Sequence, residues 1–330
     1  MLHLQPTVRL PSKREGVVSC FEWSPDGAWL AEVRAKKGGV RLWSLANSGA
    51  GSKPEVGPIA EMPGIVELPS SWKSLRWSPD GRGLSVSAAG QVRVFDVGLD
   101  GALTERWTSP CAPEHNSACA AWRPDSSALA IGVRDRVVLL DAQTGASTFD
   151  MSLGIGRAFV SALEWNPEPQ SRASELAAAT SRGLFGIDVD TRAITIDFGS
   201  SQYFNAARWW APDLVYTSDN TRLIAWNPRR GEAAGQAIVP GSITTLSLSA
   251  DRTLVAAMTR GRLVLLRTPP PSYGPEPATL EIVADMTLTG MKVPRGVWAE
   301  FHPTLPQLAV HTANAAEIDL YRWDPADLAG

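Results

Sequence analysis

Histidine and cysteine are the side chains of this sequence best suited to metal binding or nucleophilic catalysis, and both are few. The 330 residues hold four histidines and three cysteines, at His3, His115, His302, His311, Cys20, Cys111 and Cys119. His302 and His311 fall in one repeat and can approach each other across a sheet, but zinc requires further ligands that have no recognisable position here. We therefore predict no metal site and interpret these histidines as core or surface residues.

The local motifs that build catalytic or nucleotide-binding sites are absent from the sequence. It has no Gly-x-Ser-x-Gly turn, no His-Glu-x-x-His motif, no Walker loop and no dinucleotide-binding glycine motif. No catalytic residue and no cofactor is assigned, and the chain is not predicted to be an enzyme. A hydrolase or lyase whose site collects residues from separate repeats remains the alternative, because such a site needs no local motif.

The sequence contains 13 tryptophans, and several of them recur within a repeated motif. Segments such as EWSPDG at 22–27 and RWSPDG at 76–81 recur about every 46 residues along the chain. Seven such units fill the sequence, and their aligned anchor positions are Trp23, Trp77, Trp122, Trp165, Trp209, Leu248 and Phe301.

Each unit is predicted to contain four short strands. Ser-Pro-Asp-Gly at 24–27 suits a type I turn, because proline presets φ and glycine ends the turn. Apolar runs follow as second strands, β-branched runs such as 40–43 as third strands, and weaker runs such as 193–197 as fourth strands. Short, regularly spaced strands without helical periodicity indicate an all-β fold.

In these features the sequence resembles the WD-repeat family: Trp-Ser-Pro-Asp-Gly, an apolar second strand, and a third strand ending in Phe95-Asp96 or Trp323-Asp324. The resemblance covers almost the whole chain and implies one domain, residues 1–330, folded as a seven-bladed β-propeller of four-stranded antiparallel blades. The family's Gly-His before the innermost strand is missing throughout. Its buried His–Asp–Ser/Thr–Trp network therefore cannot form, and aromatic packing is expected to replace it.

The first residues are predicted to close the ring. Residues 6–10 have the character of a strand but belong to no unit, and only seven residues follow Trp323. We predict that this N-terminal strand becomes the outermost strand of the last blade, which removes an open sheet edge.

Two columns of residues flank the anchors. The residues three positions before the anchors are small, as the crowded axis requires: Cys20, Ser74, Cys119, Ala162, Ala206 and Thr245. The two cysteines among them are therefore interpreted as buried space-fillers. Immediately before the anchors stand Glu22, Arg76, Ala121, Glu164, Arg208, Ser247 and Glu300. The alternating signs predict ion pairs between neighbouring blades, Glu22 with Arg76 and Glu164 with Arg208. A channel that holds a polar ligand or ion is the alternative.

The turns between second and third strands must all emerge on one face of the ring, and they are rich in basic residues. This candidate partner-binding rim consists of Arg34, Lys36, Lys37, Arg134, Arg136, Arg182, Arg222, Arg260 and Arg262. Asp135 and Asp219 are the main acids among them. A basic rim can select an acidic or phosphorylated segment. The Pro-rich stretch 268–277 is a second candidate surface, for a partner that binds polyproline II.

Composition and net charge narrow the classes of partner and the cellular location that the sequence permits. The net charge of −3 provides no general field for nucleic acid, and no apolar stretch is long enough for a membrane span. An odd, low cysteine count and the lack of a secretory signal favour the cytoplasm. Together with the fold that the resemblance implies, these features predict a non-catalytic scaffold or a subunit of a multiprotein complex whose partners are other proteins. The alternative binding function is recognition of acidic or phosphorylated ligands through the rim.

Overall fold

The computed structural model describes most of the chain. Its described residues are 2, 4–10, 18–34, 39–45, 55–61, 74–88, 91–110, 119–167, 174–199, 203–259, 261–268, 278–288, 298–311 and 317–328. Among the residues singled out from the sequence, those outside these ranges are His3, Lys36, Lys37, Cys111, His115, Arg260 and the Pro-rich residues 269–277.

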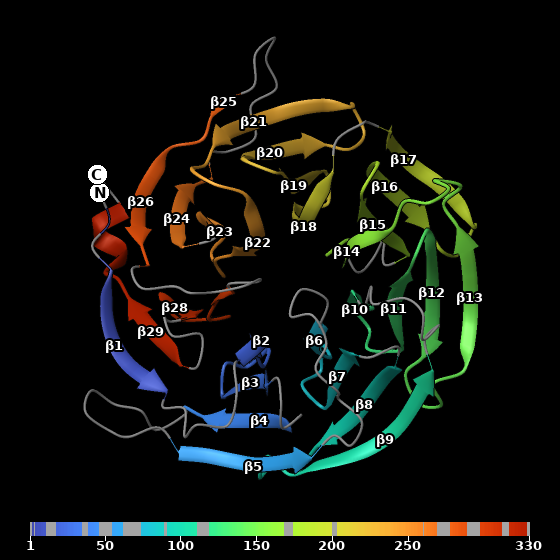
Figure 1. Cartoon of the computed structure of the whole chain (residues 1–330), viewed down its shortest axis with the longest axis horizontal. Helices are drawn as coiled ribbons and strands as arrows, with labels where there is room; N and C mark the ends of the chain where they lie inside the picture. The colour runs from blue at the N-terminus through green and yellow to red at the C-terminus, as the bar shows by residue number, and fades with distance from the viewer. Residues whose placement is uncertain are drawn as a thin grey trace.

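The described strands form seven sheets arranged in a ring, with the strand that carries the anchor residue of each sheet nearest the central axis (Figure 1). Each sheet is antiparallel and four-stranded, apart from one short parallel addition. The chain is a seven-bladed β-propeller, as predicted. The first four blades, each from the axis outward, are β2 (Val18–Trp23), β3 (Trp29–Arg34), β4 (Gly39–Ser44) and β5 (Glu55–Glu61); β6 (Ser74–Trp77), β7 (Gly83–Ala88), β8 (Gln91–Val97) and β9 (Leu103–Pro110); β10 (Ala120–Trp122), β11 (Ala128–Val133), β12 (Arg136–Asp141) and β13 (Ser147–Ser152); and β14 (Val160–Trp165), β15 (Glu175–Thr180), β16 (Gly183–Asp188) and β17 (Ala193–Gly199).

The remaining three blades follow the same order, and a short 3-10 helix, η1 (Pro325–Leu328), follows the last strand. They are β18 (Phe204–Ala211), β19 (Leu214–Asp219), β20 (Arg222–Asn227) and β21 (Glu232–Ile238); β22 (Ile243–Leu248), β23 (Leu254–Thr259), β24 (Arg262–Arg267) and β26 (Ile282–Thr287); and β27 (Ala299–Phe301), β28 (Gln307–His311), β29 (Ile318–Arg322) and β1 (Gln5–Leu10).

The Ser-Pro-Asp-Gly segments form the predicted turns. In blade 1 the Gly27 amide donates to the Ser24 carbonyl at 2.8 Å, and Gly27 has φ of +73°, which glycine adopts without strain. The Ser24 hydroxyl accepts a hydrogen bond from the Trp29 amide at 2.9 Å, and the Asp26 carboxylate accepts one from the Ala28 amide. Side-chain acceptors thus hold the backbone where the first strand turns into the second.

The N-terminal strand closes the ring as predicted. β1 pairs antiparallel with β29, with Leu10 opposite Ile318 and Val8 opposite Leu320. Leu10 is 1% exposed and lies in the cluster that joins the last blade to the first. The Arg9 guanidinium donates to the Asp319 carboxylate at 2.7 Å across the strand pair. The outer edge of β29 is therefore covered by a strand from the other end of the sequence.

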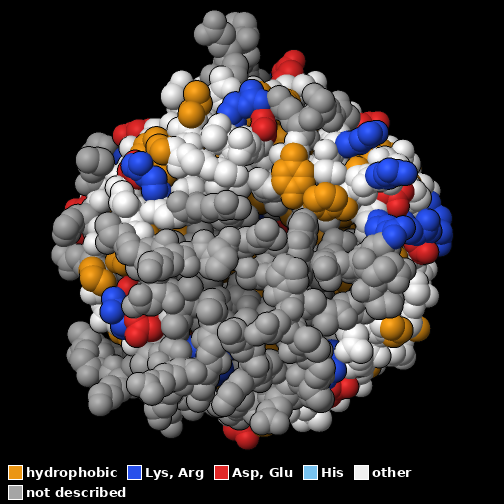
Figure 2. All heavy atoms as spheres, viewed as in Figure 1, with side chains coloured by type: hydrophobic (Ala, Val, Ile, Leu, Met, Phe, Trp, Pro, Cys, Tyr) orange, Lys and Arg blue, Asp and Glu red, His pale blue; other side chains and the backbone are white. Residues whose placement is uncertain are grey.

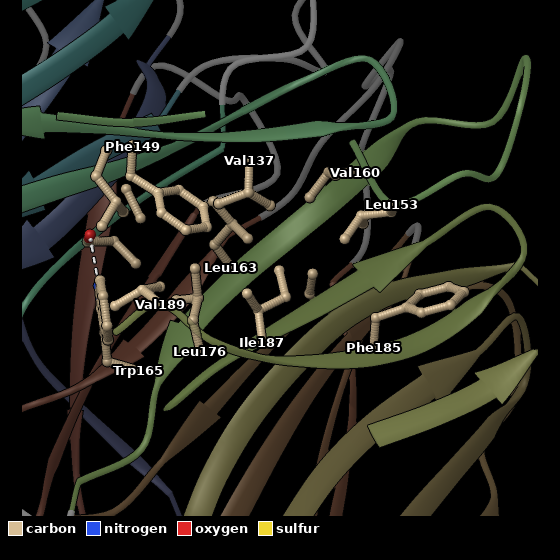
Figure 3. Close-up of a cluster of buried hydrophobic side chains, with 14 of the residues drawn as sticks. Val137, Phe149, Leu153, Val160, Leu163, Trp165, Leu176, Phe185, Ile187 and Val189 are labelled. Carbon is tan, nitrogen blue, oxygen red and sulfur yellow. Dashed lines mark hydrogen bonds between the residues drawn. The ribbon is translucent and has the colours of Figure 1, made fainter. Parts of the chain in front are cut away.

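Apolar side chains from neighbouring blades form continuous clusters. The cluster between blades 3 and 4 packs Val137 and Phe149 of one blade against Leu163, Trp165 and other side chains of the next (Figure 3). Both faces of a blade are buried in this way, which explains why second and third strands such as β15 and β24 are apolar rather than alternating.

Anchor tryptophans also form hydrogen bonds between blades, which the sequence analysis did not anticipate. Each indole Nε1 donates to the backbone carbonyl of the residue before the anchor in the preceding blade, at 2.9–3.3 Å: Trp23 to Glu300, Trp77 to Glu22, Trp122 to Arg76, Trp165 to Ala121 and Trp209 to Glu164. Phe301 has no indole, and there the Ser247 hydroxyl accepts a hydrogen bond from the Phe301 amide at 3.0 Å. This repeated contact joins the blades without the family's histidine–aspartate network.

Replacing one anchor indole should measure this contact. Trp165→Phe retains an aromatic ring but leaves the buried Ala121 carbonyl without its donor at 2.9 Å (dashed in Figure 3). We expect a loss of roughly 1–3 kcal/mol in the free energy of unfolding, the cost of an unsatisfied buried group plus lost packing. Urea denaturation of Trp165→Phe beside wild type measures it. Equal midpoints would show that the indole hydrogen bond adds nothing to stability.

A short fifth strand links blades 5 and 6. β25 (Ala278–Thr279) pairs parallel with β21, although it lies in the chain between β24 and β26 of the next blade. The Leu280 amide then donates to the Gln236 carbonyl at 2.9 Å, and the Leu280 side chain is 2% exposed. No sequence signal identified this strand, because two residues are too few for a recognisable pattern.

Candidate functional site

Charged residues from the innermost strands form the predicted pairs between blades. Arg76 Nη1 lies 3.2 Å from Glu22 Oε1, and Arg208 Nη1 lies 3.2 Å from Glu164 Oε2. These residues, together with Ser247 and Glu300, are called the axial ring below. Both predicted ion pairs are confirmed, and their side chains are largely buried.

The carboxylates of the axial ring also accept hydrogen bonds from a backbone amide and a serine hydroxyl. Glu22 Oε2 accepts a hydrogen bond from the Trp77 amide at 2.6 Å, so one side chain holds both the arginine and the anchor of the next blade. Glu300 Oε1 accepts from the Ser247 hydroxyl at 3.0 Å, while Glu300 Oε2 is buried without a hydrogen-bond partner.

Burial sets the protonation of these carboxyl groups. It raises the pKa of Glu22 to about 7, and the nearby Glu300 carboxylate adds to the rise, although Arg76 and the Trp77 amide oppose it. Burial also raises the pKa of Glu300 above its usual range. The folded protein thus holds a proton at Glu22 more tightly than an unfolded chain does, so ionisation of Glu22 weakens folding as pH rises from the usual glutamate range to about 7.

The composition of the axial ring fits a structural function better than a catalytic one. Glu22 and Glu164 are bound to arginines of adjacent blades, Glu300 is bound to the Ser247 hydroxyl, and no member of the ring is a histidine. No group of three or more His, Cys, Asp or Glu side chains in the described ranges is arranged to hold a metal ion. Within the described part of the chain, no helix has the length and apolar character needed to cross a bilayer.

The cysteines near the axis fill space. Cys20 is 1% exposed, and a Cβ atom added to Gly132 would lie 2.5 Å from the Cys119 sulfur, which shows how tightly that site is packed. Burial raises the pKa of the Cys119 thiol to about 12, so it stays protonated and a poor nucleophile. The interpretation as a buried space-filler is confirmed for Cys20, whereas Cys119 is partly buried and packs against the cluster between blades 3 and 4.

His302 is a buried residue of the seam between blades 7 and 1. Its Nδ1 accepts from the Thr304 and Leu305 amides at 3.2 and 3.1 Å, so Nε2 carries the proton and donates to the Gly27 carbonyl at 3.2 Å. The ring also packs edge-on against Trp23. Burial lowers the pKa of His302, consistent with the neutral tautomer that these contacts need.

The structure places the candidate rim arginines in different environments. Arg34 is only 4% exposed and lies 2.6 Å from Glu32, so it belongs to the interior. Three others are paired with acids that lie close to the same turns, two of them on fourth strands: Arg136 with Asp150, Arg222 with Asp219 and Arg262 with Asp285. The acids of the fourth strands could not be assigned to these turns from the sequence, because only strand register brings them there.

Two rim arginines, Arg134 and Arg182, are exposed beside a pair of aromatic residues. Phe159 and Tyr203 lie in the connections that enter blades 4 and 5, and their ring centroids are 5.6 Å apart. Arg157, also exposed, precedes Phe159 in the same connection. Together, Arg134, Arg157, Phe159, Arg182 and Tyr203 are called the arginine–aromatic surface. Arg157, Phe159 and Tyr203 were not predicted from the sequence, because they lie in connections between blades rather than in turns between second and third strands.

The arginine–aromatic surface lies on the face where the turns between second and third strands emerge, which is called the turn face below. Antiparallel order puts the connections between blades on this face as well. Figure 2 shows an exposed hydrophobic patch in the sector of β14 to β20, with Lys or Arg side chains beside it.

Comparison with solved structures identifies the same architecture elsewhere. The β-propeller domain of Cps50 (Swd1) from Myceliophteria thermophila superimposes with a TM-score of 0.73 at 18% identity, covering 97% of this chain and 99% of that one. A chain in the crystal structure of the mitotic checkpoint complex gives a TM-score of 0.71 at 17% identity, covering 98% and 93%. Both neighbours are WD40 propellers. The chain has the WD40 propeller fold.

Sequence comparison of this WD40 propeller gives a narrower match. No family model matches the chain. A probable cytosolic iron-sulfur protein assembly protein 1 from Cryptococcus neoformans var. neoformans serotype D is 35% identical over 89 residues, which are 27% of this chain. The match spans only 18% of that relative's length. The WD40 propeller fold is thus shared over the whole ring, whereas sequence similarity is confined to part of it.

Proposed function

We propose that this WD40 propeller is a non-catalytic scaffold, a cytoplasmic subunit of a multiprotein complex, that binds partner proteins through its turn face. The observation that carries the proposal is the arginine–aromatic surface, which combines exposed arginine side chains with apolar area on a rigid fold. Interfaces are typically enriched in arginine and aromatic residues. One comparison supports a role in a complex, because a neighbour with the same fold comes from the crystal structure of the mitotic checkpoint complex. The partial relative is named as a cytosolic iron-sulfur protein assembly protein, which supports the cytoplasmic part of the proposal.

Affinity purification with surface variants tests this function. The tagged chain is expressed at native level, cross-linked and purified, beside a variant with Arg134→Glu, Arg157→Glu and Arg182→Glu. Charge reversal should reduce recovery of the specific partners by roughly tenfold or more, because each reversed contact replaces attraction by repulsion. A matched control carries Arg82→Glu and Arg322→Glu, two exposed arginines at the opposite ends of the strands. Equal recovery by both variants and wild type would reject the turn face as the binding face.

A further inference from the structure

We propose that the arginine–aromatic surface binds an extended acidic segment of a partner protein, with an apolar side chain of that segment packed against Phe159 and Tyr203. The segment's carboxylates would pair with Arg157 and Arg182. This inference rests on the proposed scaffold function and specifies the chemistry of the partner.

Backbone contacts hold the members of this surface next to one another. The Val160 amide donates to the Arg134 carbonyl at 2.7 Å, so the turn of blade 3 abuts the entry to blade 4. Ser181 is joined to Phe159 twice, since its amide donates to the Phe159 carbonyl at 3.0 Å and its hydroxyl accepts from the Phe159 amide at 3.1 Å. These bonds place Arg182, the next residue, beside the aromatic pair.

The apolar part of the surface rests on a rigid base. Val160, directly after Phe159, is fully buried in the cluster between blades 3 and 4, together with Leu163 and Leu153 (Figure 3). Tyr203 likewise precedes Phe204, which is 2% exposed in the next cluster. A binding site fixed in this way loses little conformational entropy when a segment docks, so more of the contact energy appears as affinity.

Charge selects an acidic occupant. No ion pair among the described residues involves Arg157 or Arg182, and both side chains are exposed. The neighbouring acid, Asp135, accepts a hydrogen bond from the Ser152 hydroxyl at 2.8 Å. Arginine binds carboxylates through two parallel hydrogen bonds, which are the strongest such contacts at a surface. The surface is therefore positive although the chain as a whole carries a net charge of −3.

The extent of this charge favours a protein segment over nucleic acid. Arginine and aromatic side chains also bind single-stranded nucleic acid, but that requires a basic track along which many phosphates lie. Here the flanking arginines Arg136, Arg222 and Arg262 are already paired with Asp150, Asp219 and Asp285. Among the described residues of the turn face, the exposed arginines without an ion pair, Arg157 and Arg182, lie in one sector, which suits a short segment with one apolar anchor.

Binding of labelled peptides to the full chain tests the proposal by fluorescence anisotropy. The probes are peptides of about ten residues, rich in Asp and Glu, with a central Phe or with Ser in its place, together with a Lys-rich peptide containing Phe and a single-stranded oligonucleotide. We expect the acidic Phe peptide to bind at least about tenfold more tightly than the others, and more weakly as salt rises from roughly 50 to 300 mM.

Variants of exposed residues locate the site. Arg157→Glu with Arg182→Glu should weaken binding of the acidic Phe peptide about tenfold or more, whereas Arg82→Glu with Arg322→Glu should leave it unchanged. Tyr203→Ser should remove the preference for Phe over Ser in the peptide while leaving the dependence on salt. Melting temperatures near that of wild type confirm that the variants are folded.

The possible failures are distinguishable. Equal binding of the acidic and Lys-rich peptides, or tighter binding of the oligonucleotide, overturns the acidic segment as the occupant. If partner recovery in the affinity purification still depends on the three arginines, the scaffold function stands and only the chemistry of the partner is wrong. If neither the peptides nor the partners respond to the arginine variants, both proposals fail.

Discussion

Removal of residues 1–12 is expected to lower the melting temperature of this propeller by roughly 10 °C or more. The deletion should cost several kcal/mol of the free energy of unfolding, and each kcal/mol shifts the melting temperature of a large domain by about 2 °C. The deletion removes β1, and with it Leu10, which is 1% exposed in the cluster that joins blade 7 to blade 1. It also leaves the edge of β29 unpaired and Asp319 without Arg9. Differential scanning calorimetry measures the change.

Two further measurements separate ring closure from simple truncation. Deletion of residues 325–330, which follow the last strand, is the matched control and should have little effect because the described side chains at 325–327 are exposed. A synthetic peptide of residues 1–12 should raise the melting temperature of the truncated chain as its concentration increases, because it binds only the folded state. A truncated chain that melts like wild type would show that β1 is dispensable for closure.

Arg76→Met is expected to lower the free energy of unfolding by about 3 kcal/mol above pH 7, since it leaves largely buried carboxylates without their cation. Glu22 is ionised there, because its pKa is about 7 in the folded protein. At about pH 5.5 the folded protein keeps Glu22 protonated with or without Arg76, so the loss should be roughly half as large. Urea denaturation at both pH values gives the two differences.

The double variant Glu22→Gln with Arg76→Met identifies the cause of that loss. A glutamine still accepts the hydrogen bond from the Trp77 amide that Glu22 receives at 2.6 Å, but it carries no charge. The double variant should therefore recover much of the stability that Arg76→Met loses above pH 7, and its stability should vary less with pH. A loss that is independent of pH and of Glu22 would show that Arg76 acts through packing alone.

The sequence alone was enough to predict the ring and its closure. The architecture follows from local patterns, because a turn such as Ser24–Gly27 and an apolar run such as 254–259 are encoded within a few residues. Recurrence of such units about every 46 residues then favours a ring, in which neighbouring blades bury both faces of each other. The pairs Glu22–Arg76 and Glu164–Arg208 were predictable for the same reason, since equivalent positions in adjacent repeats must face each other around the axis.

Only the tertiary structure decided which charges remain available for binding. Arg34 and Arg182 occupy equivalent turns in the sequence, yet Arg34 is buried against Glu32 whereas Arg182 is exposed. Arg262 meets Asp285 because β24 and β26 pair in one particular register, 23 residues apart in the chain. Whether an arginine is neutralised by an acid depends on contacts between strands, and the proximity of Phe159 to Tyr203 depends on contacts between blades. No local sequence pattern encodes such contacts.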